Sequence, residues 1–357
     1  MKTYTKYFIY TYFKSLLFVF SIMLSLVFIL NLLSELDFFK ETDTEIYFPL
    51  FLALLNSPTM IFEIFPFIFL ITTQLFFIKL FNNNEINIFK YSGLKNSRII
   101  IILSTASIIA GILITTLFYN LSSNLKNFYL ELKSSYTTDG KYLAVITKNG
   151  LWIKDEIDGK ILIVNASKIE QSFLIDAFIT ELDENYNISR NIKSNKIDII
   201  NKNWLIYDAK IIKKNNYEFK KLFTLKTNFD YKRVQTLYSN LSSLSIFQLY
   251  QLRENYKKLN YSITELNIHL LKLIFYPLYL LLISILSALI MLKIKKIDST
   301  TFKISIGLFI SVIIYYLNNF SLVLGTTERI PIAVSVLFPL FIITVINTLM
   351  LNNINEK

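Results

Sequence analysis

Residues 15–33 read SLLFVFSIMLSLVFILNLL and contain no charged side chain. An α-helix rises about 1.5 Å per residue, so this stretch is long enough to cross the roughly 30 Å hydrocarbon layer of a bilayer. As a helix in water, these nineteen residues would expose a large apolar surface, which is energetically unfavourable. The stretch therefore predicts a membrane-spanning helix.

Five further stretches have a similar length and apolar character. The six expected spans are residues 15–33, 62–81, 99–119, 269–292, 302–320 and 331–351. They fall into two groups of three, with one long polar region between the third span and the fourth. The chain is 53% hydrophobic and has a mean hydropathy of +0.46, which agrees with a multi-pass membrane protein.

The polar region, residues 120–264, has the pattern of short strands separated by turn residues such as Asn149-Gly150 and Asp158-Gly159. We expect strands at residues 142–147, 151–154, 160–164, 173–182, 196–200, 204–212 and 218–225. Short strands at this spacing are typical of a jellyroll-like or sandwich-like β-domain. Pattern alone also allows a generic β-domain for sensing or adhesion.

An amphipathic helix is predicted to follow these strands, over residues 246–259. Ser245 can cap it, and Leu249, Leu252, Tyr256 and Leu259 make one apolar stripe. The expected organisation is a membrane block at 1–119, a β-domain with its trailing helix at 120–264, and a second membrane block at 265–357. The fold class is thus an α+β membrane protein with six transmembrane helices, three and three, around a β-jellyroll-like domain.

The charges around the spans predict the orientation, because loops rich in Lys and Arg stay in the cytoplasm. The basic residues that would share the cytoplasmic side are Lys2, Lys6, Lys14, Lys90, Lys95, Arg98, Lys293, Lys295, Lys296 and Lys303. The loop after the first span instead carries Glu35, Asp37, Glu41, Asp43 and Glu45 with only Lys40. We therefore expect both termini in the cytoplasm and the β-domain outside it.

Composition excludes several classes of protein. The formal charge of +11 is spread among apolar stretches rather than gathered on one domain, which argues against a nucleic-acid-binding protein. The chain has no cysteine and one histidine, so it offers no disulfide framework and no histidine-built metal site. With seven glycines and no GxxxxGK[ST], HExxH or GxSxG motif, we expect no cofactor and no enzymatic activity. Energy for any transport must therefore come from a partner.

The loop at residues 84–93 has the sequence signals of a short helix. Asn84 is a good N-cap, Glu85 suits the positive first turn, and Gly93 suits the C′ position. Ile86, Phe89 and Lys90 are expected to share one face. Such a helix can contact a cytosolic protein and transmit its movement to the spans on either side; the alternative is an ordinary solvated turn.

The order of several motifs resembles that of the LptF/LptG permease family. Asn84-Glu85-Ile86, followed by Tyr91-Ser92-Gly93, is similar to the family's SEL…aaG coupling helix, with Asn84 in place of Ser. Phe62-Glu63-Ile64-Phe65-Pro66 is similar to its YELLP motif at the second span. Lys272 with Tyr276-Pro277 resembles its fourth span. The resemblance covers essentially the whole chain.

The resemblance implies a permease subunit of an ABC transporter that extracts lipopolysaccharide from the outer leaflet of the bacterial inner membrane. It implies four partners: an LptF-like paralogue, an LptB-like ATPase dimer that contacts Asn84, Glu85, Ile86, Phe89, Lys90 and Gly93, an LptC-like bridge protein, and the lipid itself. Residues 150–155, GLWIKD, look like the start of the β-domain in LptG members and favour that branch over LptF. A membrane-anchored periplasmic sensor is the remaining alternative, and the lack of a cytoplasmic effector region counts against it.

The resemblance also implies a lipid cavity lined by spans one and five. The candidates on those spans are Phe13, Leu17, Phe20, Leu24, Phe309, Tyr316 and Phe320; ordinary lipid-facing or interhelical packing is the alternative. Basic residues that the family often places at the outer end of span one are replaced here by Asn31, Ser34, Glu35 and Asp37. Lys40, His269 and Lys272 are the substitute candidates for headgroup contact, unless the lysines only extend their ammonium groups to the interface.

Overall fold

The structure is a computed structural model. It describes residues 3–40, 45, 47–134, 136, 151–157, 160–170, 172–183, 186–213, 216–231, 234, 240–258, 262–294 and 299–352. The chain folds into two compact units, each considered by itself here. The membrane unit comprises Met1–Lys126 and Thr264–Lys357, and the β unit comprises Asn127–Ile263.

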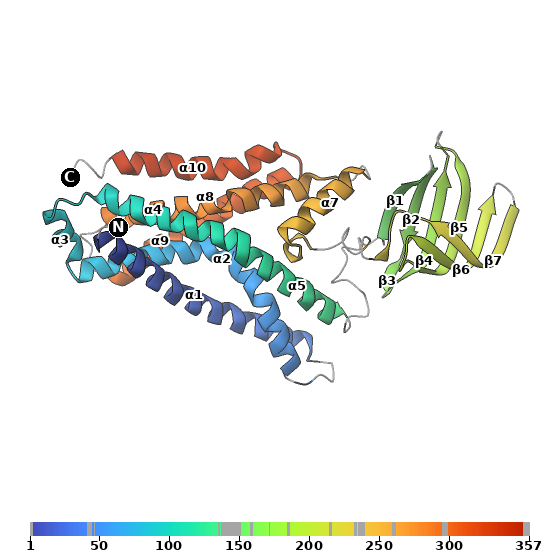
Figure 1. Ribbon diagram of the computed structural model, residues 1–357, viewed down its shortest axis with the longest axis horizontal. Helices are drawn as coiled ribbons and strands as arrows, with labels where there is room; N and C mark the ends of the chain where they lie inside the picture. The colour runs from blue at the N-terminus through green and yellow to red at the C-terminus, as the bar shows by residue number, and fades with distance from the viewer. Residues whose placement is uncertain are drawn as a thin grey trace. The chain divides into compact units, whose positions relative to one another are not determined.

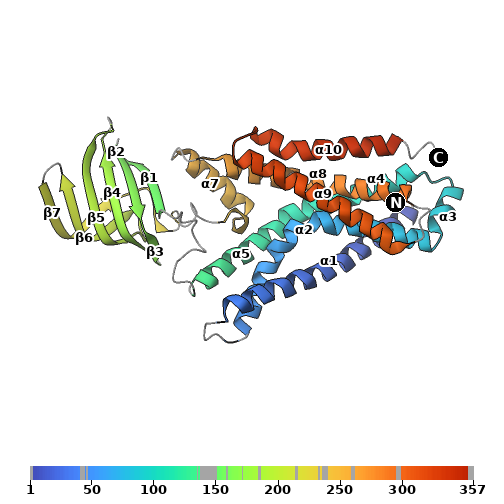
Figure 2. The same ribbon diagram turned by 180° about the vertical axis from the view of Figure 1, so that it is seen from behind.

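Six helices in the described residues are long and apolar enough to cross a membrane, as expected. They are α1 (Thr3–Phe38), α2 (Tyr47–Asn82), a third helix made of α4 (Asn96–Leu113), the π-helical turn η1 (Ile114–Phe118) and α5 (Tyr119–Ser134), then α8 (Thr264–Lys293), α9 (Thr300–Thr326) and α10 (Ile332–Asn352). Short α3 (Glu85–Tyr91) joins α2 to α4. Figures 1 and 2 show α1 beginning and α10 ending at the same end of the membrane unit as α3.

Several helices extend beyond the expected spans. Helix α2 begins at Tyr47 rather than near residue 62 and contains Pro58 and Pro66, which membrane helices tolerate because neighbouring helices satisfy the freed backbone groups. The third helix continues to Ser134 instead of ending at residue 119. Glu35 was expected in an exposed acidic loop, and this was wrong: it lies within α1 and is 2% exposed.

The membrane unit is packed around α2 and α8. In their apolar stretches 67% of residues are buried, against 17% in α1 and 22% in α9. Side-chain hydrogen bonds join the helices, as is common where water is excluded. The Tyr12 hydroxyl lies 2.8 Å from that of Ser107, and the Ser287 hydroxyl donates to the Leu70 carbonyl at 2.9 Å. Helices α1 and α9 therefore have most of their apolar surface uncovered by the described residues.

The β unit contains one antiparallel sheet in its described part. Its strands are β1 (Leu151–Ile157), β2 (Lys160–Ala166), β3 (Lys168–Glu170), β4 (Phe173–Leu182), β5 (Ile188–Asp198), β6 (Asn203–Lys213) and β7 (Asn216–Lys226). The order is β1-β2-β4-β5-β6-β7, with β3 on β4. Neighbouring strands in this sheet follow their order along the chain, whereas a jellyroll has two sheets with Greek-key connections. The jellyroll topology therefore stays a prediction. The strand expected at 142–147 lies outside the described residues.

The core of the β unit forms because buried and exposed residues alternate along the strands. Trp204 is fully buried, and its indole nitrogen donates to the Phe229 carbonyl at 2.7 Å. A 3₁₀ turn, η2 (Leu241–Ser243), precedes α7 (Ile246–Lys258), the predicted amphipathic helix. Ser245 and Gln248 form a capping box, in which the Ser245 amide donates to Gln248 Oε1 at 2.8 Å. Leu249 and Leu252 are buried as expected, whereas Leu259 lies outside the described residues.

Candidate functional site

Helix α3 follows α2 through a sharp change of direction. Asn84 has a left-handed backbone (φ 56°) and makes no side-chain cap hydrogen bond, so the expected N-cap role of its side chain was wrong. Its carbonyl instead accepts from the amides of Asn87 and Ile88 at 3.2 and 3.4 Å. Asparagine is among the few residues that adopt this conformation readily, which explains its place in such a tight turn.

The Glu85 carboxylate connects three elements. Its Oε2 accepts a 2.7 Å hydrogen bond from the Tyr7 hydroxyl of α1, and its Oε1 accepts a 2.9 Å hydrogen bond from Asn83 Nδ2. A carboxylate in the first turn also interacts favourably with the positive end of the helix. Glu85 thus fixes the start of α3 against α1 and the end of α2.

The far end of α3 is closed as the sequence predicts. Gly93 has a φ of 80°, and the Gly93 and Leu94 amides donate to the carbonyls of Lys90 and Phe89, both at 2.9 Å. These two bonds make a Schellman motif, in which a left-handed C′ residue satisfies the last helical carbonyls. Glycine adopts this conformation without strain.

The two faces of α3 differ in what they contact. Ile86 is buried, and Phe89 packs edge-on against Phe8 with ring centroids 4.8 Å apart. Ile86 and Phe89 therefore anchor α3 to its own membrane unit, whereas Lys90 is exposed and does not share their buried surroundings. The apolar side chains presented outward are Ile88, 59% exposed, and Tyr91, 92% exposed.

An open groove of about 670 Å³ lies beside the exposed face of α3. It is lined by Thr3, Tyr4, Tyr7, Glu85, Ile88, Phe89, Ser92 and Leu94. The groove joins the start of α1 to α3, and its walls are mainly apolar. It lies at the end of the membrane unit where α1 begins.

The cavity candidates divide into exposed and packed side chains. Leu17 on α1 and Phe309, Tyr316 and Phe320 on α9 are each 65–68% exposed. Phe20 instead stacks on Phe65 with centroids 5.9 Å apart. Phe13 is half-buried at the edge of the core cluster and Leu24 is half-buried on α1. The exposed set forms part of the unpaired apolar surfaces of α1 and α9.

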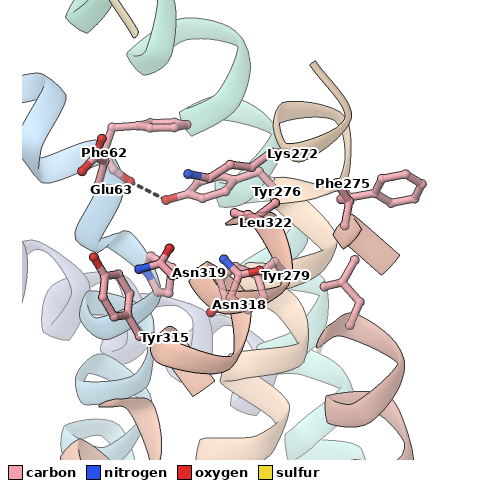
Figure 3. A pocket seen from close by; sticks show the side chains of 13 residues that line it. Phe62, Glu63, Lys272, Phe275, Tyr276, Tyr279, Tyr315, Asn318, Asn319 and Leu322 are labelled. Atoms are coloured by element: carbon pink, nitrogen blue, oxygen red, sulfur yellow. Dashed lines mark hydrogen bonds between the residues drawn. The ribbon is translucent and has the colours of Figure 1, made fainter. Parts of the chain in front are cut away.

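The headgroup candidates are brought together only in part. Lys272 lines a pocket with Glu63, Tyr279 and two asparagines (Figure 3). His269 lies one helical turn away on α8, with its Nε2 2.9 Å from the Tyr119 hydroxyl. Lys40 is exposed at the end of α1 and does not line this pocket.

Three residues of the α3 region escaped the sequence reasoning. Ile88 and Tyr91 are spaced by three residues, a signal of a second helical face that could have been recognised. The contact of Tyr7 with Glu85 joins residues 78 positions apart, and no local pattern reports such a pair.

No curated protein matched the sequence. The family described as the lipopolysaccharide export system permease LptF/LptG matches residues 6–353, nearly the whole chain. The chain therefore belongs to the LptF/LptG family, whose members are permeases of the ABC transporter that exports lipopolysaccharide.

Proposed function

We propose that the chain is the LptG-type subunit of this exporter in the inner membrane of a Gram-negative bacterium. Both termini and α3 then lie in the cytoplasm, and the β unit lies in the periplasm. The exposed Lys90, Lys95 and Arg98 around α3 support this orientation, because positive loops are retained on the cytoplasmic side.

The observation that carries the proposal is the arrangement of α3. One face is fixed to the membrane unit through Ile86, Phe89 and the Glu85 carboxylate, while Ile88 and Tyr91 face outward beside the groove. A helix that is anchored on one side and exposes apolar groups on the other is suited to transmit a partner's movement. We assign this surface to an LptB-like ATPase dimer, which supplies the hydrolysis that the chain lacks.

The unpaired faces of α1 and α9 are assigned to an LptF-like subunit and to the acyl chains of lipopolysaccharide. Leu17, Phe309, Tyr316 and Phe320 are the side chains that we place along this cavity. Their exposure of 65–68% supports the assignment, because large apolar side chains that are exposed on a membrane helix are normally covered by a partner or by lipid. The β unit then receives the lipid or docks the LptC-like bridge.

The choice of LptG over LptF rests on residues 150–155. Trp152, in the second position of β1, is 53% exposed. Co-expression with tagged LptF and tagged LptG from the same bacterium tests the assignment: we expect the chain to be retained by tagged LptF. Preferential retention by tagged LptG would make this chain the LptF-type subunit.

The coupling role is tested by Glu85→Lys. The substitution places positive charge at the positive helix end and breaks the Tyr7 bond, at a cost of about 0.5–2 kcal/mol within α3. If the carboxylate also meets a basic group of the ATPase, docking loses roughly 2–5 kcal/mol. We expect the variant to insert normally but to retain far less ATPase on co-purification.

Glu254→Lys on α7 is the matched control, because Glu254 is an exposed acidic residue of the β unit. It should leave ATPase retention unchanged. Wild-type retention and wild-type ATPase activity in Glu85→Lys would remove the assignment of α3 as the coupling element.

A further inference from the structure

A polar pocket of about 200 Å³ lies among α2, α8, α9 and α10 (Figure 3). Glu63 is 19 residues from the end of α2 (82 − 63), and Lys272 is 21 residues from the end of α8 (293 − 272). At about 1.5 Å per residue, both lie roughly 30 Å from the α3 end of the unit. With the α3 end at one membrane interface, as in the proposed function, this distance of about one hydrocarbon thickness places the pocket at headgroup depth on the opposite face.

The pocket contains a carboxylate and an ammonium group that do not form an ion pair with each other. Glu63 is exposed, Lys272 is half-buried, and both line the pocket. Neither makes a hydrogen bond or an ion pair with another described residue. Lys126 adds a second positive charge near Glu63 but does not line the pocket. A carboxylate and an ammonium held apart at one site can each bind a charge of a single ligand.

The other residues of the pocket can also be divided into those suited to an anion and those suited to a cation. Asn318 and Asn319 on α9 also make no hydrogen bond with the described residues, so their amides are available beside Lys272. The aromatic rings of Tyr276, Tyr279 and Tyr315 line the same pocket as Glu63. Amide and ammonium donors favour a phosphate, whereas a carboxylate with aromatic faces favours a cation.

The pocket has room for a small headgroup and is partly open. Its volume of about 200 Å³ corresponds to several water molecules, since each occupies about 30 Å³ in the liquid. That space accepts a headgroup of a few heavy atoms. The apolar wall of Leu322, Val336 and Leu340 lies on α9 and α10, where acyl chains of the same lipid can continue.

We propose that this pocket binds the headgroup of a bilayer glycerophospholipid that carries both a phosphate and a primary ammonium, as phosphatidylethanolamine does. Lys272 and the two asparagines contact the phosphate, and Glu63 contacts the ammonium. The bound lipid joins α9 to α2 and α8, and so stabilises a helix of which 22% of the apolar stretch is buried. This inference concerns a resident lipid and is independent of the transported one.

The wild-type chain provides the first test. The full-length protein, purified in detergent and stripped of lipid, is titrated with phosphatidylethanolamine, phosphatidylglycerol, phosphatidylcholine or lipopolysaccharide. Native mass spectrometry measures the bound lipid and thermal unfolding measures stabilisation. We expect phosphatidylethanolamine to bind roughly tenfold more tightly than the other three, the factor expected for one added charge-assisted contact. Equal binding of phosphatidylglycerol, or preferential binding of lipopolysaccharide, would overturn the proposal.

Two variants test the roles of the charged groups. Lys272→Met should weaken phosphatidylethanolamine binding roughly tenfold, and Glu63→Gln should remove the preference for it over phosphatidylglycerol. Lys79→Met, at an exposed lysine near the far end of α2, should leave lipid binding at the wild-type level. Unchanged lipid preference in both pocket variants would contradict the assignment. ATPase retention at α3 is measured separately and does not depend on this result.

Discussion

The Tyr7 hydroxyl donates a 2.7 Å hydrogen bond to Oε2 of Glu85, across 78 residues of sequence. The bond joins α1, one of the two helices with large unpaired apolar faces, to the short helix that we assign to ATPase docking. Phe8 on the next position packs against Phe89 and reinforces the same link. A displacement of α3 therefore acts directly on the start of α1.

Tyr7→Phe removes this hydrogen bond while it keeps the aromatic ring. A hydrogen bond to a charged group contributes about 1.5–3 kcal/mol, and the lower value suits this half-buried pair. We expect normal expression but a severalfold lower rate of ATP-driven lipopolysaccharide release by the assembled exporter. Tyr10→Phe, at an exposed tyrosine of the same helix, is the control. Equal rates in the two variants would show that the bond does not couple α3 to α1.

Tyr91→Ala tests the outward face of α3. The side chain is 92% exposed, so its removal should leave thermal stability of the isolated chain unchanged. If Tyr91 is a central docking residue, its truncation costs about 2 kcal/mol or more of binding energy. Affinity for the ATPase should then fall roughly thirtyfold. Phe247→Ala on α7, at a residue 70% exposed in the β unit, should leave that affinity as it was.

Gly111→Val tests the packing of α4 on α8. A β-carbon at position 111 would lie 2.9 Å from the Pro277 Cα, a backbone atom that cannot move aside. The helices must separate, and overpacking of this kind costs about 1–3 kcal/mol. We expect a lower unfolding temperature in detergent, whereas Ile112→Val, at an exposed position of the same helix, should be neutral. A wild-type unfolding temperature for Gly111→Val would mean that the two helices are not in close contact.

The orientation can be measured by cysteine labelling, because the chain has no cysteine of its own. Asn187→Cys lies in the β unit and Lys95→Cys lies beside α3, and both positions are exposed. In intact spheroplasts we expect an impermeant thiol reagent to label the first variant only. Permeabilised cells, in which both should react, are the control. Labelling of both variants in intact spheroplasts would rule out the proposed topology.

The six spans were predictable because membrane helices carry their signal in composition and length. The early part of α2 was not, since Asn56 and Pro58 interrupt its apolar pattern. Asn56 is accommodated by a tertiary contact, in which its amide donates to Asn31 Oδ1 at 3.1 Å. Glu35 was misplaced for a related reason: burial of a charged residue depends on partners that local sequence does not report.

In the β unit, too, some strands could be predicted from local sequence and others depend on tertiary contacts. Strands β4 and β6 were predicted because Ile, Leu, Phe and Trp alternate along them. Most of β5 was missed, since only Ile192 and Ile197 are buried apolar residues in Ile188–Asp198. Its exposed positions carry mainly polar residues, namely Ser189, Lys193, Asn195 and Lys196. Its place is set by pairing with β4 and β6 on both sides. In α3, the helix end at Gly93 could be predicted from sequence, because glycine readily adopts the left-handed backbone of a C′ residue. The inward direction of Ile86 and Phe89 could not be predicted in this way, because it depends on α1.

Reconstituted transport tests the central proposal most directly. The chain is placed in liposomes with lipopolysaccharide, alone or with an LptF-like subunit, an LptB-like ATPase and an LptC-like protein, and release of the lipid to a soluble acceptor is measured with and without ATP. We expect no ATP hydrolysis and no release by the chain alone, and ATP-dependent release by the complete assembly. ATP hydrolysis by the isolated chain, or a complete assembly that hydrolyses ATP without releasing lipopolysaccharide, would contradict the proposed function.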